Sequence, residues 1–281
     1  MQTIPRIAIS HLPKRYAELC ERTGEKFLII QRFDATDGNP DILQASSFKT
    51  IHSTMTDGAV GCMLSHIEAW KYIRDLPCRF AMLAEDDWIP PPQWTKHLHE
   101  IIAKVPDDVD IVMLTHPSSS IWCDNRSVAV GQTIKVNSTY ILRECLPCFS
   151  TGCMAITPRG ASKLLLNLGS THLVPSDILT SISVATLEQL RDASSVMGLD
   201  VKGGIDPTDP YFIISESTLH IRQNPNFSQI KAYTVQRPKK YDLLCNGKYH
   251  ISQFGTTPIN INSSTEVKRF NIRDHMQRQS V

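Results

Sequence analysis

The sequence has almost no excess of charge of either sign. Lysine and arginine together number 29, aspartate and glutamate together 28, and the formal net charge is +1. A protein that binds nucleic acid non-specifically needs a broad basic surface to neutralise phosphates. The near balance argues against such a surface, so we expect a small polar ligand and no nucleic-acid partner.

Long apolar runs are also missing. No stretch approaches the roughly twenty consecutive apolar residues of a membrane-spanning helix. Residues 1–10 hold one short apolar run interrupted by Pro5, without the basic start or the length of a signal peptide. We therefore expect a cytoplasmic protein, either of a bacterial cell or of a virus-infected host cell.

Cysteine is sparse, and its eight positions do not form the dense pattern of a disulfide-stabilised domain. Cys145 and Cys148, with Cys153 nearby, have the spacing of half a zinc site. A zinc site usually needs a second pair at matching spacing, and the sequence has none. The pattern therefore favours buried or structural thiols over a metal or redox site.

The sequence does contain short apolar runs that alternate with segments of helical periodicity, which is typical of an α/β sheet with crossover helices. The run at 80–84 is unbroken, as expected for a strand buried on both faces. The helix predicted at 56–75 has apolar residues at helical spacing on one face. The other predicted strands are 6–9, 27–30, 110–115, a pair within 131–142, 151–157 and 211–215. The other predicted helices are 13–22, 93–104, 158–168 and 176–194.

Three acidic residues, Glu85, Asp86 and Asp87, directly follow the buried strand. In open α/β sheets, ligands bind outside the carboxyl ends of the strands. Adjacent carboxylates repel one another unless they share a cation, and such hard oxygen ligands suit Mg²⁺ or Mn²⁺. The alternative is an acidic turn that caps local backbone amides, which is common at strand ends. The triplet alone does not decide between the two.

The segment from Thr56 to His66 reads Thr-Asp-Gly-Ala-Val-Gly-Cys-Met-Leu-Ser-His. It resembles the pattern Thr-x-Gly-Glu-x-Gly-Cys-x-x-Ser-His of the family-25 glycosyltransferases, which include lipooligosaccharide and collagen β-galactosyltransferases. In that family an apolar strand and Glu-Asp-Asp follow. Residues 34–38, 151–161 and 175–177 resemble further family segments in the same order. The matches span roughly residues 4 to 180 and form an ordered set, which is more specific than a single motif.

Two places depart from the family pattern. Ala59 replaces a glutamate, and in the opening segment 10–15 only Arg15, with Lys14 as a weaker match, carries over. These changes favour an altered donor or acceptor, and they motivate the alternative of a catalytically silent protein that binds a sugar nucleotide or a glycan. The intact acidic triplet and Asp177 oppose that alternative. A metal-dependent phosphoesterase would need more histidine and aspartate ligands.

The resemblance implies a GT-A-type α/β fold with a Rossmann-like nucleotide-binding half and a mixed central sheet. We expect one catalytic domain over 1–250, divided into a nucleotide-sugar half (1–115) and an acceptor half (116–250), and a polar tail over 251–281. The implied reaction is the inverting, metal-dependent transfer of galactose or glucose from a UDP-sugar to a hydroxyl of a glycan or glycoconjugate. Lipopolysaccharide biosynthesis is the expected setting, and Mn²⁺ or Mg²⁺ is the expected cofactor.

The resemblance also implies roles for single residues. Asp177 is the expected catalytic base, with a helix-start carboxylate as the alternative. The expected metal ligands are Asp86, Asp87 and, by analogy alone, His220, which is otherwise an ordinary strand histidine. The expected substrate-binding residues are Arg15, Asp34, Asp37, Ser65, His66 and Glu85.

Overall fold

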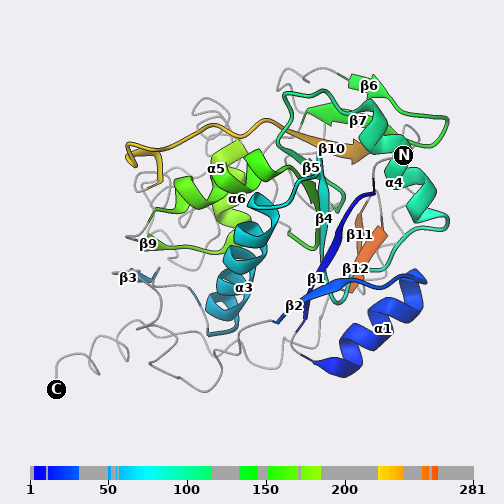
Figure 1. The fold of residues 1–281 in the computed structure, drawn as a ribbon, viewed down its shortest axis with the longest axis horizontal. Helices are drawn as coiled ribbons and strands as arrows, with labels where there is room; N and C mark the ends of the chain where they lie inside the picture. The colour runs from blue at the N-terminus through cyan, green and yellow to red at the C-terminus, as the bar shows by residue number, and fades with distance from the viewer. Residues whose placement is uncertain are drawn as a thin grey trace, which may run out of the picture.

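The computed structural model of the protein describes 3–10, 12–31, 50–51, 55, 57–115, 133–144, 151–169, 172–184, 221–236, 249–252 and 255–258. Every structural statement below concerns these residues. They form an α/β fold built on a mixed sheet, which confirms the predicted fold class (Figure 1).

The central sheet has eight strands in the order β2-β1-β4-β8-β5-β10-β7-β6. β1 is parallel to both of its neighbours, whereas β8 is antiparallel to β4 and β5. β10 is parallel to β5, and β7 and β6 complete the edge in antiparallel pairing. The strands are β1 (Arg6–Ser10), β2 (Leu28–Gln31), β4 (Ala81–Glu85), β5 (Ile111–Met113), β6 (Thr133–Lys135), β7 (Ile141–Glu144), β8 (Cys153–Ile156) and β10 (Ala232–Gln236).

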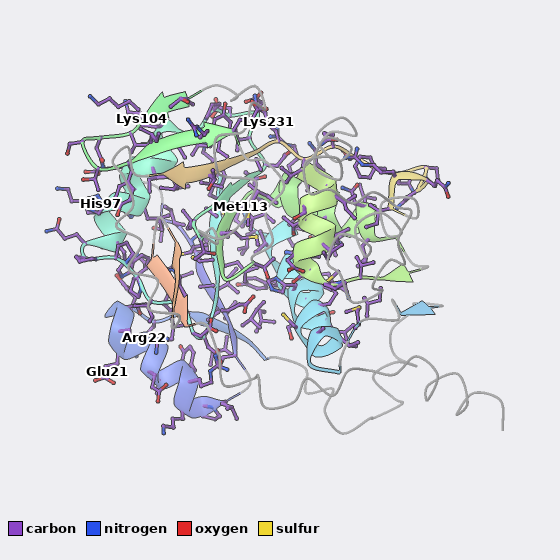
Figure 2. The ribbon with its side chains drawn as sticks, turned by 180° about the vertical axis from the view of Figure 1, so that it is seen from behind. Glu21, Arg22, His97, Lys104, Met113 and Lys231 are labelled. Atoms are coloured by element: carbon purple, nitrogen blue, oxygen red, sulfur yellow. The ribbon has the colours of Figure 1, made fainter. Side chains whose placement is uncertain are left out.

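Helices cover both faces of this sheet, and each face has its own apolar core. The helices are α1 (Pro13–Thr23), α3 (Asp57–Arg74), α4 (Trp94–Lys104), α5 (Pro158–Leu168) and α6 (Ser176–Val184). Successive residues of a strand point to opposite faces. Thus Ile7 and Ile9 pack in one cluster with α3, α5 and α6, while Ala8 packs in the other with α1 and α4. Figure 2 shows Arg22 of α1 and His97 of α4 on the same side of the sheet.

The chain diverges at β1. It passes through α1 to β2 on one side of β1, and later through α3 to β4 on the other side. α1 and α3 cover opposite faces of the sheet. The carboxyl ends of β1 and β4 therefore border a topological switch point, which is where open α/β sheets bind their ligands.

Most predicted elements agree with the structure within about three residues, the usual uncertainty of element ends. α6 is described to Val184, so the rest of the helix predicted to 194 lies outside the described residues, as does the strand predicted at 211–215. The sequence did not predict β10, the short pair β3 (Thr50–Ile51) with β9 (His172–Leu173), or the hairpin of β11 (Tyr249–Ser252) and β12 (Gly255–Pro258). The domain boundaries stay a prediction.

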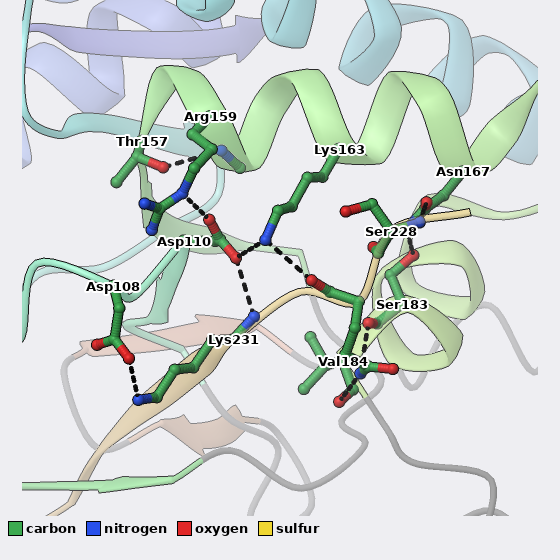
Figure 3. A network of polar contacts seen from close by, with 12 residues as sticks. Asp108, Asp110, Thr157, Arg159, Lys163, Asn167, Ser183, Val184, Ser228 and Lys231 are labelled. Atoms are coloured by element: carbon green, nitrogen blue, oxygen red, sulfur yellow. Dashed lines mark hydrogen bonds and ion pairs between the residues drawn. The ribbon is translucent and has the colours of Figure 1, made fainter. Parts of the chain in front are cut away.

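A buried ionic network lies at the end of the sheet opposite the acidic triplet. Asp110 directly precedes β5, which runs in the same direction as β4, whereas the triplet lies at the carboxyl end of β4. Asp110 is fully buried. Its carboxylate accepts from Arg159 Nε at 2.6 Å, Lys163 Nζ at 2.7 Å and the Lys231 backbone N–H at 3.0 Å (Figure 3). The side chain thus ties β5 to α5 and β10.

Replacing Asp110 with asparagine is expected to lower the free energy of unfolding by about 3 kcal/mol, because two cations lose their buried partner. Burial opposes ionisation, but the contacts with Lys163, the Lys231 backbone and Arg159 outweigh it and lower the pKa of Asp110. A lowered folded-state pKa stabilises the fold above the unfolded pKa of about 3.9, and this stabilisation is lost as the pH falls through the folded value. The wild-type advantage should therefore shrink below about pH 4.

Urea denaturation at several pH values measures this effect. Asp108→Asn is the matched control, because Asp108 is an exposed partner of Lys231 in the same segment. We expect a small, nearly pH-independent change in the control. Equal destabilisation of the two variants at neutral pH would contradict a special role for Asp110.

Candidate functional site

The acidic triplet does not act as one unit, because its side chains face different layers of the fold. Asp86 turns toward α1, where its Oδ2 accepts from Ser10 Oγ at 2.8 Å and its Oδ1 lies 2.6 Å from Arg15 Nη2. Asp86 is only 4% exposed. Both of its oxygens are therefore engaged by protein groups, as a buried carboxylate requires.

Backbone contacts also fix this turn. The Asp86 N–H donates to the Ile9 carbonyl at 3.2 Å, which continues the pairing of β1 with β4. Arg22 Nη2 donates to the Asp86 carbonyl at 2.6 Å from α1. Two arginines of α1 thus contact Asp86: Arg15 contacts its carboxylate, and Arg22 donates to its backbone carbonyl.

Glu85 turns the other way, toward α3 and α6. Its Oε1 accepts from Thr151 Oγ1 at 3.0 Å and lies 3.5 Å from His66 Nε2. Thr151 Oγ1 is also 3.2 Å from Ser176 Oγ. Because Thr151 has a single hydroxyl proton and gives it to Glu85, Ser176 is the donor in the second bond. A hydroxyl chain therefore runs from the start of α6 to Glu85.

His66 is fully buried on α3, and its Nε2 lies beside Glu85 of the triplet. Burial alone would lower its pKa. The nearby Cys62 thiol and Glu85 carboxylate outweigh burial and raise the pKa of His66 to about 9. At neutral pH, His66 therefore carries a positive charge against Glu85.

Asp87 is the least satisfied member of the triplet. Its Oδ1 is buried and has no hydrogen-bond partner among the described residues, and Arg15 Nη2 lies 3.6 Å from its Oδ2. Burial and the charge of Glu85 raise the pKa of Asp87 to about 6, although Arg15 opposes the shift. An unpartnered buried carboxylate oxygen next to other acids suits a bound cation.

Asp177 lies in the first turn of α6, where its Oδ1 accepts from the Ile178 N–H at 2.9 Å. Burial raises its pKa, the Ile178 hydrogen bond opposes this, and the charge of Glu85 raises it further. Glu85 thus acts electrostatically on both Asp87 and Asp177. Glu85, Asp87 and Asp177 are therefore electrostatically linked, and we call these three residues the charged cluster.

The remaining predicted site residues differ in their outcome. Ser65 is fully buried and donates to the Gly61 carbonyl at 2.7 Å, and its substrate contact stays a prediction. Arg15 lies at the site, paired with Asp86. Asp34, Asp37 and His220 lie outside the described residues, as do Cys145 and Cys148.

A sequence model of glycosyltransferase family 25, described as LPS biosynthesis proteins, matches residues 7–180. This range is more than half of the 281 residues and contains the whole charged cluster. The chain belongs to glycosyltransferase family 25. The protein is therefore a glycosyltransferase, and the resemblance found in its motifs is confirmed. No curated protein matches the chain.

Membership of glycosyltransferase family 25 implies a sugar donor and an acceptor, but it identifies neither of them. Within the described part of the chain, no helix is both long enough and apolar enough to cross a membrane. The sequence analysis gave no role to four residues of the site: Ser10, Thr151, Ser176 and Cys62. Three of them lie in segments that resemble the family, and Ser10 directly follows the strand predicted at 6–9.

Proposed function

We propose that this glycosyltransferase transfers galactose or glucose from a UDP-sugar to a hydroxyl of a glycan or glycoconjugate, with inversion at the anomeric carbon and with the help of Mn²⁺ or Mg²⁺. The observation that carries the proposal is the buried Asp87 Oδ1, which has no hydrogen-bond partner among the described residues and lies in the acidic triplet at the switch point of the sheet; the charge of Glu85 links Asp177 to the same site. Such a position suits a nucleotide ligand, and such a cluster suits a cation with a diphosphate.

The residues present fit the implied metal. Asp87 offers a buried oxygen with no hydrogen-bond partner in the described chain. Glu85, two residues earlier in the sequence, offers a partly exposed carboxylate. Asp86 is better suited to positioning, because Ser10 and Arg15 occupy both of its oxygens. We therefore assign Asp87 as the main metal ligand and Glu85 as the donor-facing carboxylate. A bound Mn²⁺ or Mg²⁺ would neutralise the charge that develops on the departing diphosphate.

Asp177 is the proposed proton acceptor. Inversion requires the acceptor oxygen to bond to the anomeric carbon while the bond from that carbon to the diphosphate oxygen breaks, through an oxocarbenium-like transition state. The acceptor hydroxyl must lose its proton to a nearby base. Burial and Glu85 raise the pKa of Asp177, which makes it a stronger base than an exposed aspartate.

The expected acceptor is a lipopolysaccharide-type glycan, because the family description names LPS biosynthesis. The cytoplasm of a bacterial cell or of a virus-infected host cell is the proposed location. Incubation with Mn²⁺ and a panel of nucleotide sugars, followed by measurement of nucleotide release with and without acceptors, tests the proposal. UDP release from UDP-galactose or UDP-glucose supports it. Donor binding without release from any donor would instead indicate a silent binding protein.

Thr151 is expected to position Glu85. Thr151→Val keeps the volume but removes the hydroxyl that donates to Glu85 Oε1. A hydrogen bond to a charged group is worth about 1.5–3 kcal/mol, so we expect the KM for the donor to rise about tenfold or more, with a smaller change in kcat. Thr151→Ser should restore the KM, because it restores the hydroxyl. Steady-state kinetics with varied donor check this, and an unchanged KM in Thr151→Val contradicts it.

A further inference from the structure

A second kind of metal-binding arrangement lies beside the proposed donor site. Cys62 and His66 are four residues apart on α3, so both side chains lie on one face of the helix. Glu85 reaches the same place from the end of β4. One potential ligand atom from each of the three residues lies within 4.8 Å of the other two.

The donor set selects the kind of cation. A thiolate and an imidazole are ligands of Zn²⁺, whereas Mn²⁺ and Mg²⁺ prefer carboxylate and water oxygens. Zinc bonds of about 2.0–2.3 Å at tetrahedral angles place ligand atoms about 3.3–3.8 Å apart. Cys62 and Glu85 are partly exposed, so rotation of their side chains can close the remaining distance. Three protein ligands leave a fourth position open for water.

The histidine gives an independent indication of a missing ligand. His66 is fully buried, and its Nδ1 has no hydrogen-bond partner within the described part of the chain. Its Nε2 lies 3.5 Å from Glu85 Oε1, at the outer limit of a hydrogen bond. A buried imidazole is normally well hydrogen-bonded, and those that bind metals use one ring nitrogen for the cation. The ring therefore has unused bonding capacity at Nδ1 and only a weak contact at Nε2.

We propose that Cys62, His66 and Glu85 form a Zn²⁺ site, separate from the Mn²⁺ or Mg²⁺ position at Asp87. Binding of Zn²⁺ releases two protons to solvent, one from the Cys62 thiol and one from the protonated His66 imidazole. Zinc binding draws the Glu85 carboxylate toward α3 and away from the Thr151 hydroxyl. Because Glu85 is also the proposed donor-facing carboxylate, occupied zinc and bound donor compete. This second consequence rests on the proposed function, whereas zinc binding itself does not.

Cobalt binding tests the site directly. Co²⁺ added to the metal-free full chain is expected to give a thiolate-to-cobalt charge-transfer absorption, and one equivalent of Zn²⁺ should remove it. Cys62→Ser should abolish the absorption, and His66→Ala should weaken Co²⁺ binding at least tenfold. Cys78→Ser is the matched control, since Cys78 is another partly buried free thiol, and it should keep the absorption.

Two further variants make the result decisive. A double Cys145→Ser, Cys148→Ser variant should keep the absorption, because those cysteines have the spacing of half a zinc site. Asp87→Asn should also keep it. Absorption that survives in Cys62→Ser, or that disappears in the double variant, overturns the proposal. If Cys62→Ser loses its far-ultraviolet circular dichroism, Glu85→Gln replaces it as the decisive variant, and at least tenfold weaker Co²⁺ binding is required of it.

Zinc inhibition tests the competition with the donor. With saturating Mn²⁺, micromolar Zn²⁺ is expected to raise the KM of the wild type for its donor. In Cys62→Ser the rate measured with Zn²⁺ should approach the rate measured without it. Inhibition of equal strength in both proteins overturns the competition. If no donor is turned over at all, the proposed function fails, and the cobalt absorption still decides the zinc site.

Discussion

Asp87→Asn is expected to reduce metal-dependent donor turnover by about a thousandfold, one of the two largest effects that we predict for a single substitution. The asparagine keeps the shape of the side chain but removes the negative charge of the carboxylate, whose Oδ1 has no hydrogen-bond partner among the described residues. Metal stabilisation of a leaving diphosphate is worth several kcal/mol, and each 1.4 kcal/mol is about tenfold. Donor binding should also lose its dependence on Mn²⁺.

Calorimetric titration of UDP with and without Mn²⁺, together with nucleotide release, measures both effects. Asp75→Asn is the control, because Asp75 is an exposed aspartate paired with Arg74 at the end of α3. We expect wild-type behaviour in the control. If Asp87→Asn still binds UDP more tightly with Mn²⁺ than without it, Asp87 is not the main metal ligand.

Asp177→Asn is expected to lower kcat by about 10²–10⁴-fold, the range of general base catalysis, while the donor Kd changes by no more than about twofold. Asparagine can still accept the Ile178 N–H and so preserves the first turn of α6. It cannot take a proton from the acceptor hydroxyl. The two substitutions therefore separate metal binding from proton transfer.

Donor Kd and single-turnover rates with a working acceptor check this separation. The wild-type rate should fall on the acid side as Asp177 becomes protonated, at a pH above the usual aspartate value because its pKa is raised. The contribution of Asp177 to this acid limb should disappear in Asp177→Asn, whereas the contribution of Asp87 should remain. Equal loss of donor binding in Asp87→Asn and Asp177→Asn would refute the division of roles.

The order of strands and helices along much of the chain could be predicted from the sequence, because apolar runs and helical spacing are local signals. The run 80–84 could be placed as a buried strand, and Thr157 with Pro158 could be placed at a helix start. Strand direction could not be predicted, since the antiparallel course of β8 depends on its pairing with β4 and β5. β10 was missed because its partners are distant in sequence, and a short segment such as Ala232–Gln236 gives a weak signal alone.

The site was predictable where one strand carries it and not where several elements meet. The family resemblance selected both His66 and Glu85, and the structure places His66 Nε2 3.5 Å from Glu85 Oε1, although the substrate-binding role of both stays a prediction. Asp86 lies in the turn that follows β4, and its pairing with Ser10 and Arg15 depends on the docking of α1, which local sequence signals do not give. The contact of Thr151 with Glu85 exists because β8 starts where β4 ends.

The site draws side chains from both helix layers, with Arg15 from α1 on one face of the sheet and His66 and Asp177 from α3 and α6 on the other. The site exists only when both helix layers pack on the sheet, so its ligand binds the folded state and not the unfolded state. Such a ligand stabilises the fold by about 2.7 kcal/mol at a hundred times its Kd. Melting temperatures measured with Mn²⁺ and different nucleotide sugars can therefore rank donors before any acceptor is known.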